Sequence, residues 1–280
     1  MGSSRIIHKI NAGVVLVFLT LVSFIVLYPL AYVVSSAFTP GNSIADMPII
    51  PFTGGVTTDN FTNLFNNTDY PTWFRNTFQV ALATSFGTLI VASLGAYTFS
   101  RFRFAFKKTF MMSLLVLQVF PLTTGLIAIF VILFRFGLLD NLWGLVLIYL
   151  AANTPFNTWL MKSYLDTIPK SMDEAARIDG ASHFRTFFTI IMPMAKPIMI
   201  FLLITSFTGP WMDFIIPTMV LRSTPNHTLA MGLFSFITER RNDFTSFAAG
   251  SILIAIPFVI FFVATQKILI TSLGAGAVKE

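Results

Sequence analysis

Residues 174–193 read Glu-Ala-Ala-Arg-Ile-Asp-Gly-Ala-Ser-His-Phe-Arg-Thr-Phe-Phe-Thr-Ile-Ile-Met-Pro, a polar stretch between two long apolar regions. Its fixed points are Glu174, Ala175 and Ala176, then Gly180 after three intervening residues. Pro193 lies thirteen positions beyond Gly180 and closes the stretch. Such a connection lies on the surface, where functional residues are common.

This stretch carries the signals of a short helix. Pro169 ends the preceding helix, and Ser171 lies three residues before Glu174, the spacing of a capping box. Gly180 falls where a left-handed residue commonly ends a helix. Two alanines add little bulk, so another protein surface can approach closely. We expect a docking helix; an amphipathic helix at the membrane surface, without a partner, is the alternative.

Composition indicates a membrane protein. Hydrophobic residues make up 55% of the chain, charged residues 11%, and the mean hydropathy is +0.78. A helical span needs about 20 apolar residues. We therefore predict one all-α domain over residues 1–280, with a coupling loop at 166–196 and a tail at 271–280. The six predicted transmembrane helices are 13–37, 77–99, 110–133, 142–161, 197–219 and 247–269.

Lysine and arginine set the orientation. If both termini lie on one side, that side holds 13 of the 18 basic residues, and the other side holds 5. Both termini and the loop at 166–196 are therefore predicted to be cytoplasmic. The net charge of +6 suits an anionic lipid surface and is no evidence for nucleic acid. The basic residues of the cytoplasmic side are Arg5, Lys9, Arg101, Arg103, Lys107, Lys108, Lys162, Lys170, Arg177, Arg185, Lys196, Lys267 and Lys279.

Missing chemistry narrows the function. Five of the six predicted spans have no ionisable residue at mid-depth, which argues against an ion-coupled carrier. No G-x-x-x-x-G-K-[ST] segment is present to hold ATP. The sequence has no cysteine, and its three histidines lie far apart, so neither a metal site nor a catalytic triad is expected. A membrane-embedded enzyme would need a polar catalytic cluster that we do not find. A protein that moves a solute without these features must take its energy from a partner.

The Glu-Ala-Ala and glycine spacing resembles the EAA loop of permease subunits of binding-protein-dependent, ATP-driven (ABC) importers. The resemblance implies a type I importer permease fold in the bacterial cytoplasmic (inner) membrane. It implies four partners around this chain: a sister permease, two ATPase subunits and an extracytoplasmic sugar-binding protein. ATP and magnesium would bind to the ATPase partners, so this chain would hold no cofactor and would not be an enzyme. The implied docking residues are Glu174, Ala175, Ala176, Asp179, Gly180 and Pro193.

Shorter matches resemble carbohydrate permeases. Asn76, Tyr97 and Arg101 fall where such permeases carry similar residues around their second span. Residues 211–214, Trp-Met-Asp-Phe, are similar to a Trp-Asn-Asp/Glu-Phe signature that has asparagine where this chain has methionine. Gly274 and Gly276 predict a flexible, nearly uncharged strand; it resembles the tail of maltose-type G subunits, which implies a tail contact with the ATPases, and a disordered end is the alternative. The implied substrate is maltose or a maltodextrin; another oligosaccharide or glycerol phosphate is the alternative.

Neutral polar residues cluster near Pro121 and Pro155, which lie inside two predicted spans and favour kinks there. The carbonyl groups freed at these prolines could bind an uncharged sugar. Interhelical hydrogen bonding is the alternative for each of them. Asp213 is the only carboxylate in a span and lies near the outer interface, where we expect it to reach water, pair with Arg222 or gate the path with Trp211. The candidate pathway residues are Gln118, Thr123, Thr124, Asn153, Asn157, Trp211 and Asp213.

The outer segment at 222–246 is more polar than a connector requires. In maltose-type G subunits the equivalent segment reaches the docked binding protein, so we expect the same contact here. A plain solvated loop is the alternative. The polar residues concerned are Arg222, Asn226, His227, Glu239, Arg240, Arg241 and Asp243.

Overall fold

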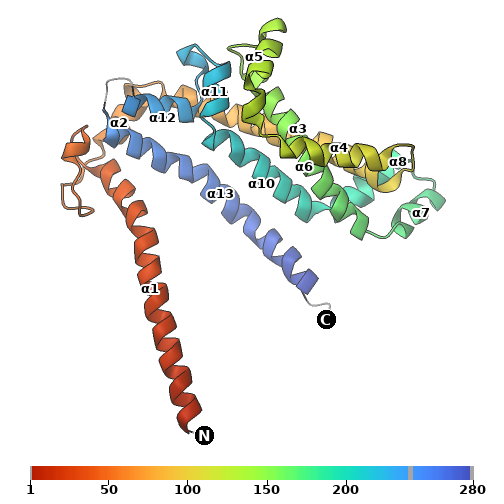
Figure 1. Ribbon diagram of the computed structural model, residues 1–280, viewed down its shortest axis with the longest axis horizontal. Coiled ribbons are helices and arrows are strands. Elements are labelled where there is room, and N and C mark those ends of the chain that lie inside the picture. Colours follow the sequence, from red (N-terminus) through yellow and green to blue (C-terminus); the bar gives the residue numbers. More distant parts are fainter. Residues whose placement is uncertain (1, 239–241, 278–280) are drawn as a thin grey trace. The chain divides into compact units, whose positions relative to one another are not determined.

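All regular structure in the described residues, 2–238 and 242–277 of the computed structural model, is helical (Figure 1). The chain divides into two units. The first comprises Met1–Tyr70 and Leu233–Ala255, and the second comprises Pro71–Gly232 and Ile256–Glu280. Each unit has a hydrophobic core of its own. The helical structure agrees with the predicted all-α class.

The first unit holds the end of α1 (Gly2–Phe38) against α2 (Asp59–Asn66) and the start of α13 (Phe244–Ala277). Its small core contains Ala37, Ala248 and Ala249. The buried Asn60 amide donates hydrogen bonds to the carbonyl groups of Ala37 and Thr39, both at 2.9 Å. These bonds satisfy carbonyls that the end of α1 leaves free. The exit of α1 is thereby fixed to the segment that follows it.

The second unit begins with α3 (Tyr70–Arg101), which packs along α6 (Leu142–Thr167). Glycines permit the close approach: a Cβ at Gly87 would lie 2.7 Å from Leu150 Cδ2, and one at Gly95 would lie 3.2 Å from Thr158 Cγ2. Small residues serve this purpose at membrane helix interfaces. Three elements lie between α3 and α6 in the chain: α4 (Lys107–Val119), η2 (Leu122–Gly125) and α5 (Leu126–Arg135).

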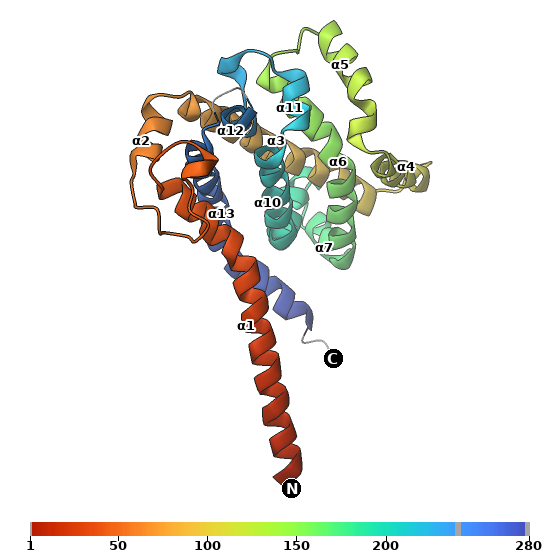
Figure 2. The ribbon, with the colours of Figure 1, turned by 60° about the vertical axis from the view of Figure 1, so that its left-hand side comes forward.

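The remainder of the second unit starts where α6 ends. Figure 2 shows α6 and α10 side by side, with α7 beside their ends. A buried cluster that includes Met161, Leu165, Phe187, Ile191 and Leu202 joins α6 to the segment after α7. The elements in chain order are α7 (Ser171–Ile178), α8 (His183–Thr186), η3 (Phe187–Ile191), α9 (Met192–Met194), α10 (Lys196–Met212), α11 (Ile215–Val220), η4 (Thr224–Asn226) and α12 (Leu229–Thr238).

Three described helices are long and apolar enough to cross a membrane: Gly13–Phe38, Tyr70–Arg101 and Phe244–Phe261. Two further pairs, bent by 87° at residues 120–121 and by 81° at residue 195, raise the number to five if each pair forms one span. The fourth predicted span is helical in α6 but does not meet this criterion, because Asn153 and Asn157 interrupt its apolar sequence. The six-span count and the side of the termini stay predictions.

Two predicted spans are broken helices. The span at 110–133 bends after Phe120, because Pro121 donates no backbone hydrogen bond and keeps the residue before it extended. The span at 197–219 stops at Met212, and Asp213 is extended with ψ of 125°. Irregular backbone at membrane depth is tolerated where protein or a cavity surrounds it. The bend at Pro121 agrees with the expectation that prolines inside the spans favour kinks.

The tail also differs from the prediction. We expected Gly274 and Gly276 to give a flexible strand, but α13 continues as a helix through Ala277. A helical glycine costs about 1 kcal/mol relative to alanine, which two isolated positions can tolerate. Residues 278–280 lie outside the described residues.

Candidate coupling site

Helix α7 begins one turn after α6 ends. Lys170 precedes it in helical conformation, and Glu174 N donates to Lys170 O at 3.1 Å. Ser171 is therefore the first residue inside the helix and not its cap, so the predicted capping box is wrong. Pro169 has its φ fixed near the helical value and starts the turn before serine can cap it. Met172 N donates to Pro169 O at 3.2 Å in that turn.

The other end of α7 follows the prediction. Gly180 has φ of +81°, in the left-handed region that favours glycine. Ala181 N donates to Ala176 O at 2.9 Å, and Gly180 N donates to Arg177 O at 3.0 Å. This pair of bonds is the Schellman arrangement that ends helices. A Cβ at Gly180 would meet no atom within 4 Å, so only the backbone angle requires glycine here.

The two alanines of α7 lie on different faces. Ala176 is buried, whereas Glu174, Ala175 and Asp179 are exposed. We expected both alanines on a docking surface, and the structure leaves only Ala175 available. Ile178, which the sequence reasoning did not select, is 88% exposed. An exposed apolar side chain at the end of a polar helix is a candidate contact for a partner protein.

Arg101, the last residue of α3, holds α7 in place. Its Nε donates to Asp173 Oδ2 at 2.8 Å, and its side chain is only 6% exposed. Its two terminal nitrogens donate to Leu165 O and Ile168 O, both at 3.0 Å. Leu165 and Ile168 lie at the end of α6, so one guanidinium joins the ends of α3 and α6 to the first turn of α7. Tyr97 Oη also donates to Asp173, at 3.4 Å.

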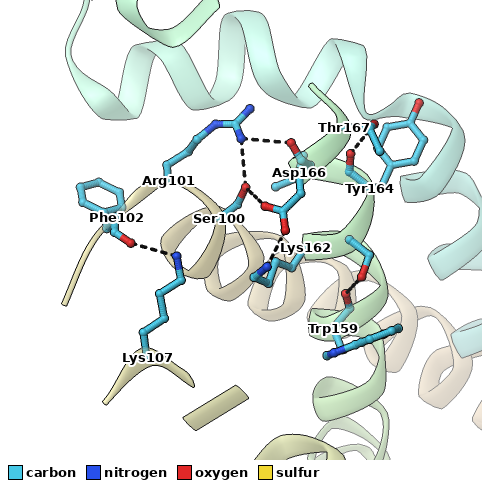
Figure 3. A network of polar contacts seen from close by, with 11 residues as sticks. Ser100, Arg101, Phe102, Lys107, Trp159, Lys162, Tyr164, Asp166 and Thr167 are labelled. Atoms are coloured by element: carbon cyan, nitrogen blue, oxygen red, sulfur yellow. Dashed lines mark hydrogen bonds and ion pairs between the residues drawn. The ribbon is translucent and has the colours of Figure 1, made fainter. Parts of the chain in front are cut away.

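A second polar contact joins α3 to α6 beside Arg101 (Figure 3). Ser100 Oγ donates to Asp166 Oδ1 at 2.6 Å, and Lys162 Nζ donates to Asp166 Oδ2 at 2.5 Å. Burial alone would raise the pKa of the Asp166 carboxyl, but the hydrogen bonds from Lys162 and Ser100 outweigh it and lower the pKa. Asp166 is therefore ionised at neutral pH and fixes the end of α6.

After α7 the chain packs onto the same body. Phe187, Ile191 and Met192 enter the cluster that contains Tyr97 and Leu165. Residues 187–191 form a π-helical turn before Pro193. Proline cannot donate to the carbonyl four residues earlier, and a π turn is one way a helix accommodates that loss. Pro193 itself is exposed, which fits a role in shaping this turn more than a direct contact.

The candidate pathway residues fall into separate places. Gln118 is exposed on α4, and its Nε2 donates to Ala152 O of α6 at 3.3 Å. Asn157 is buried on α6 and donates to Asn153 O at 2.8 Å, one turn earlier. Thr123 and Thr124 are exposed at the bend between α4 and α5. Gln118 therefore contacts α6, whereas the amide of Asn157 is used in a hydrogen bond within α6 itself.

Trp211 is 1% exposed and packs against the rings of Phe74, Phe207 and Phe258. This burial gives it a packing role within the chain. Asp213 accepts a hydrogen bond from Tyr149 Oη at 2.8 Å.

The predicted pairing of Asp213 with Arg222 is wrong. Asp213 Oδ1 instead accepts from Ile215 N at 2.9 Å and so satisfies the start of α11. Arg222 lies over the ring of Phe130, 5.5 Å from its centre. The helix break thus supplies a free amide that is a nearer partner for the carboxylate than the arginine.

The predicted outer segment is fixed at its start. Asp140 Oδ1 accepts from Arg222 N at 2.9 Å and from Ser223 N at 3.0 Å. Asn226 Nδ2 donates to Asp140 O at 2.7 Å. Partial burial alone would raise the pKa of Asp140, but hydrogen bonds from Ser223 and the Arg222 backbone outweigh it and lower the pKa. The sequence reasoning missed Asp140, because nothing in the local pattern links it to residues some 80 positions later.

Asn76 and Thr77 hold the same segment from α3. Asn76 Nδ2 donates to Pro225 O at 2.8 Å and to His227 O at 3.0 Å. Thr77 Oγ1 accepts from Leu229 N at 2.7 Å, at the start of α12. These bonds anchor residues 225–229 to α3, while Arg222, Thr224 and Pro225 are exposed. The contact with a binding protein, like its alternative of a plain solvated loop, stays a prediction. Residues 239–241 of the predicted segment lie outside the described residues.

A family model described as "Binding-protein-dependent transport system inner membrane component" matches residues 87–273, which contain α7 and its supports. The chain belongs to this family. It is an inner-membrane permease of a binding-protein-dependent (ABC) importer and is not itself an enzyme. Within the described residues, no group of acidic, histidine or cysteine side chains could hold a metal ion.

Curated relatives of this permease carry sugar names. It is 39% identical over 279 residues, 99% of each chain, to the maltodextrin transport system permease protein MdxG of Bacillus subtilis (strain 168). It is 38% identical to the galactooligosaccharides transport system permease protein GanQ of the same organism, over 93% of each chain. It is 34% identical to the maltodextrin permease MalD of Streptococcus pneumoniae, over 99% of each chain. The permease is therefore a component of a carbohydrate importer.

Solved structures show the same fold. A chain of a bacterial ABC transporter that imports the acidic polysaccharide alginate superposes with a TM-score of 0.81. The match covers 95% of this permease and 98% of that chain at 23% identity. A second structure, of a bacterial alginate ABC transporter in complex with an alginate pentasaccharide-bound periplasmic protein, has a TM-score of 0.68. These matches support the type I importer permease fold.

Proposed function

We propose that this permease takes up maltodextrins or a similar neutral oligosaccharide, powered by ATP that separate subunits hydrolyse. A sister permease would complete the path, two ATPase subunits would bind ATP and magnesium, and an extracytoplasmic binding protein would deliver the sugar. The nearly equal identities to a maltodextrin permease and a galactooligosaccharide permease favour neutral oligosaccharides as a class. Galactooligosaccharides are the second candidate substrate for the same reason.

The observation that carries this proposal is the exposed face of a rigidly held α7. Glu174, Ala175 and Ile178 are exposed, while Arg101 and Asp173 fix the helix from behind. Ile178 is 88% exposed, and a partner that covered it would remove its apolar surface from water. We assign this face to an ATPase subunit.

The attachment of α7 to α3 and α6 would couple ATP hydrolysis in the partner subunits to movement of the permease helices. Because Arg101 binds α3, α6 and α7 together, displacement of α7 by the ATPases would displace the ends of both long helices. Closure of the ATPase dimer on ATP would turn the path outward, and hydrolysis would reset it. Such alternating access requires two packings of the same helices, which packed cores permit as discrete states.

Sugar contacts would come from neutral groups. Gln118, Thr123 and Thr124 are exposed amides and hydroxyls on α4 and the bend after it. Neutral donors and acceptors suit uncharged hydroxyl groups. Asn153 is the partly exposed candidate on α6. We propose these four residues for the path and assign packing or capping roles to Asn157, Trp211 and Asp213.

Two further contacts belong to the proposal. The helix end that contains Gly274 and Gly276 would meet the ATPases, and the segment at 222–246 would meet the sugar-loaded binding protein. Deletion of residues 273–280 tests the first contact. It should leave sugar uptake impaired while the chain still inserts; unimpaired coupling of ATP hydrolysis to uptake would remove the tail from the mechanism.

Uptake in proteoliposomes tests the function as a whole. Proteoliposomes that contain the complete importer with this permease should accumulate labelled maltodextrin when ATP is added. The Ile178→Asp variant should abolish this uptake, because it places a charge in the proposed contact. Ile49→Asp, at an exposed site predicted to lie on the outer side, is the matched control and should transport normally. Uptake of galactooligosaccharide but not maltodextrin would select the second candidate, and normal uptake by Ile178→Asp would remove α7 from coupling.

A further inference from the structure

A cavity of about 680 Å³ opens beside the Arg101 network. It is lined by residues of the connection from α3 to α4, of α4 and of α6. Figure 3 shows Lys107 at the start of α4, and Lys162 and Trp159 on α6. Lys108, Phe104 and Phe106 complete the part of its lining that matters here. The cavity thus combines lysines with aromatic rings.

The lysines leave the cavity with positive charge to neutralise. Lys162 already binds Asp166, which also accepts from Ser100. Lys107 Nζ donates to the neutral carbonyl of Phe102 at 3.1 Å. Burial, followed by repulsion from Lys162, lowers the pKa of Lys107. Within the described part of the chain, Lys108 forms no ion pair.

The aromatic residues indicate the depth in the membrane at which this cavity lies. Phe104 is 39%, Phe106 75% and Trp159 38% exposed. All three lie near the ends of α3, α4 and α6, on the side of α7. Aromatic rings and lysines together at the ends of membrane helices are typical of the headgroup layer of a bilayer.

We propose that this cavity binds the headgroup of an anionic phospholipid, with its phosphate beside Lys107, Lys108 and Lys162. The first acyl carbons lie against Trp159 and Phe104. No side chain caps the N-terminus of α4, so its first amide groups add to the attraction for an anion. Free phosphate shares the anionic chemistry but would not cover the exposed rings of Phe106 and Trp159, which is why we assign a lipid.

Tryptophan quenching by brominated lipids tests the assignment. The complete importer in nanodiscs is compared with the same importer carrying Trp159→Phe, and the difference isolates Trp159 from the other tryptophans. Brominated phosphatidylglycerol should quench this signal at a lower lipid fraction than brominated phosphatidylcholine. Lys107→Gln/Lys108→Gln should remove the preference, because each lysine near a membrane surface contributes about fivefold in affinity.

Two further variants separate binding at this cavity from misfolding and from general attraction of lysines to anionic lipid. Lys108→Gln alone removes an exposed side chain that the fold does not use, and it should reduce the preference by about fivefold. Lys196→Gln removes an exposed lysine outside the cavity and should leave the preference intact. Equal quenching by both lipids in the wild-type chain would overturn the proposal. So would binding of inorganic phosphate in phosphatidylcholine discs without any lipid preference, and so would protection of Trp159 from both lipids by a partner subunit.

Discussion

Arg101 Nε lies 2.8 Å from Asp173 Oδ2, which joins the last residue of α3 to the first turn of α7. The two residues are 72 positions apart, and their side chains are 6% and 13% exposed. The same guanidinium binds two carbonyl groups at the end of α6. Lysine could not reproduce this, because its single ammonium lacks the planar fork of donors.

Loss of Arg101 should uncouple ATP hydrolysis from uptake. Arg101→Gln leaves the Asp173 carboxylate, 13% exposed, without its ion-pair partner and with Tyr97 as its remaining side-chain donor, at a cost of about 3 kcal/mol. We expect ATP hydrolysis by the reconstituted importer to persist while sugar uptake falls at least tenfold. The two rates, measured in the same vesicles, check this.

The double variant Arg101→Gln/Asp173→Asn separates charge burial from coupling. It removes the unpaired charge, so it should be more stable than Arg101→Gln yet remain uncoupled. Lys162→Gln breaks only the partly exposed pair on α6, worth about 0.3–0.5 kcal/mol, and serves as the control. Normal coupling in Arg101→Gln, in a chain that folds, would refute a role for the clamp.

Replacement of Gly180 should act through the backbone alone. A side chain at this position meets open space, but φ of +81° is strained for a β-branched residue by about 1–3 kcal/mol. Gly180→Val should therefore reduce uptake strongly, and Gly180→Asn, which tolerates this angle, should reduce it less. Uptake normalised to the amount of inserted protein measures both. Equal activity of the two variants and the wild type would mean that the turn after α7 does not matter.

Asp140→Asn should destabilise the outer end of the second unit. Asparagine retains the left-handed angle, φ of 55°, but removes the negative charge that accepts two backbone hydrogen bonds. We expect a loss of about 1 kcal/mol, since the carboxylate is only partly buried. Thermal unfolding in detergent measures it.

The pH dependence of this effect follows from the sign of the pKa shift. The folded-state pKa of Asp140 lies below its ordinary value, so its stabilisation is fully present above that ordinary value and is lost as pH falls through the lowered one. The difference between wild type and Asp140→Asn should thus be the same at about pH 7 and about pH 5. A difference that disappears between these two values would contradict the lowered pKa.

The sequence predicted the end of α7, which depends on neighbouring residues, but not its start, where Ser171 lies inside the helix instead of capping it. Gly180 ends the helix because a left-handed turn is a local requirement, and its spacing from Glu174 is visible in the sequence. The partners of Arg101 were not predictable, because a basic residue after a span reads first as an orientation signal. Nor was the burial of Ala176, which depends on packing against the segment after α7.

The size of the bend at Pro121 and the break at Asp213 also depend on packing that the sequence does not show. Pro121 and Asp213 were noted in the sequence, but a proline in a membrane helix kinks it by an amount that its neighbours decide. Asp213 caps α11 because the helix breaks beside it, and the break is seen only in three dimensions. Hydropathy locates apolar segments, and it does not tell a straight helix from a bent pair.

Site-directed crosslinking from Ile178 tests the central claim most directly. The chain has no cysteine, so Ile178→Cys provides a single reactive thiol on the exposed face of α7. In the intact importer, a thiol-to-amine crosslinker should join this position to an ATPase subunit, with a yield that changes when ATP is added. Ile49→Cys, 82% exposed in a segment predicted to lie on the outer side, should give no such product. Absence of the Ile178→Cys product in an importer that still transports sugar would contradict the account.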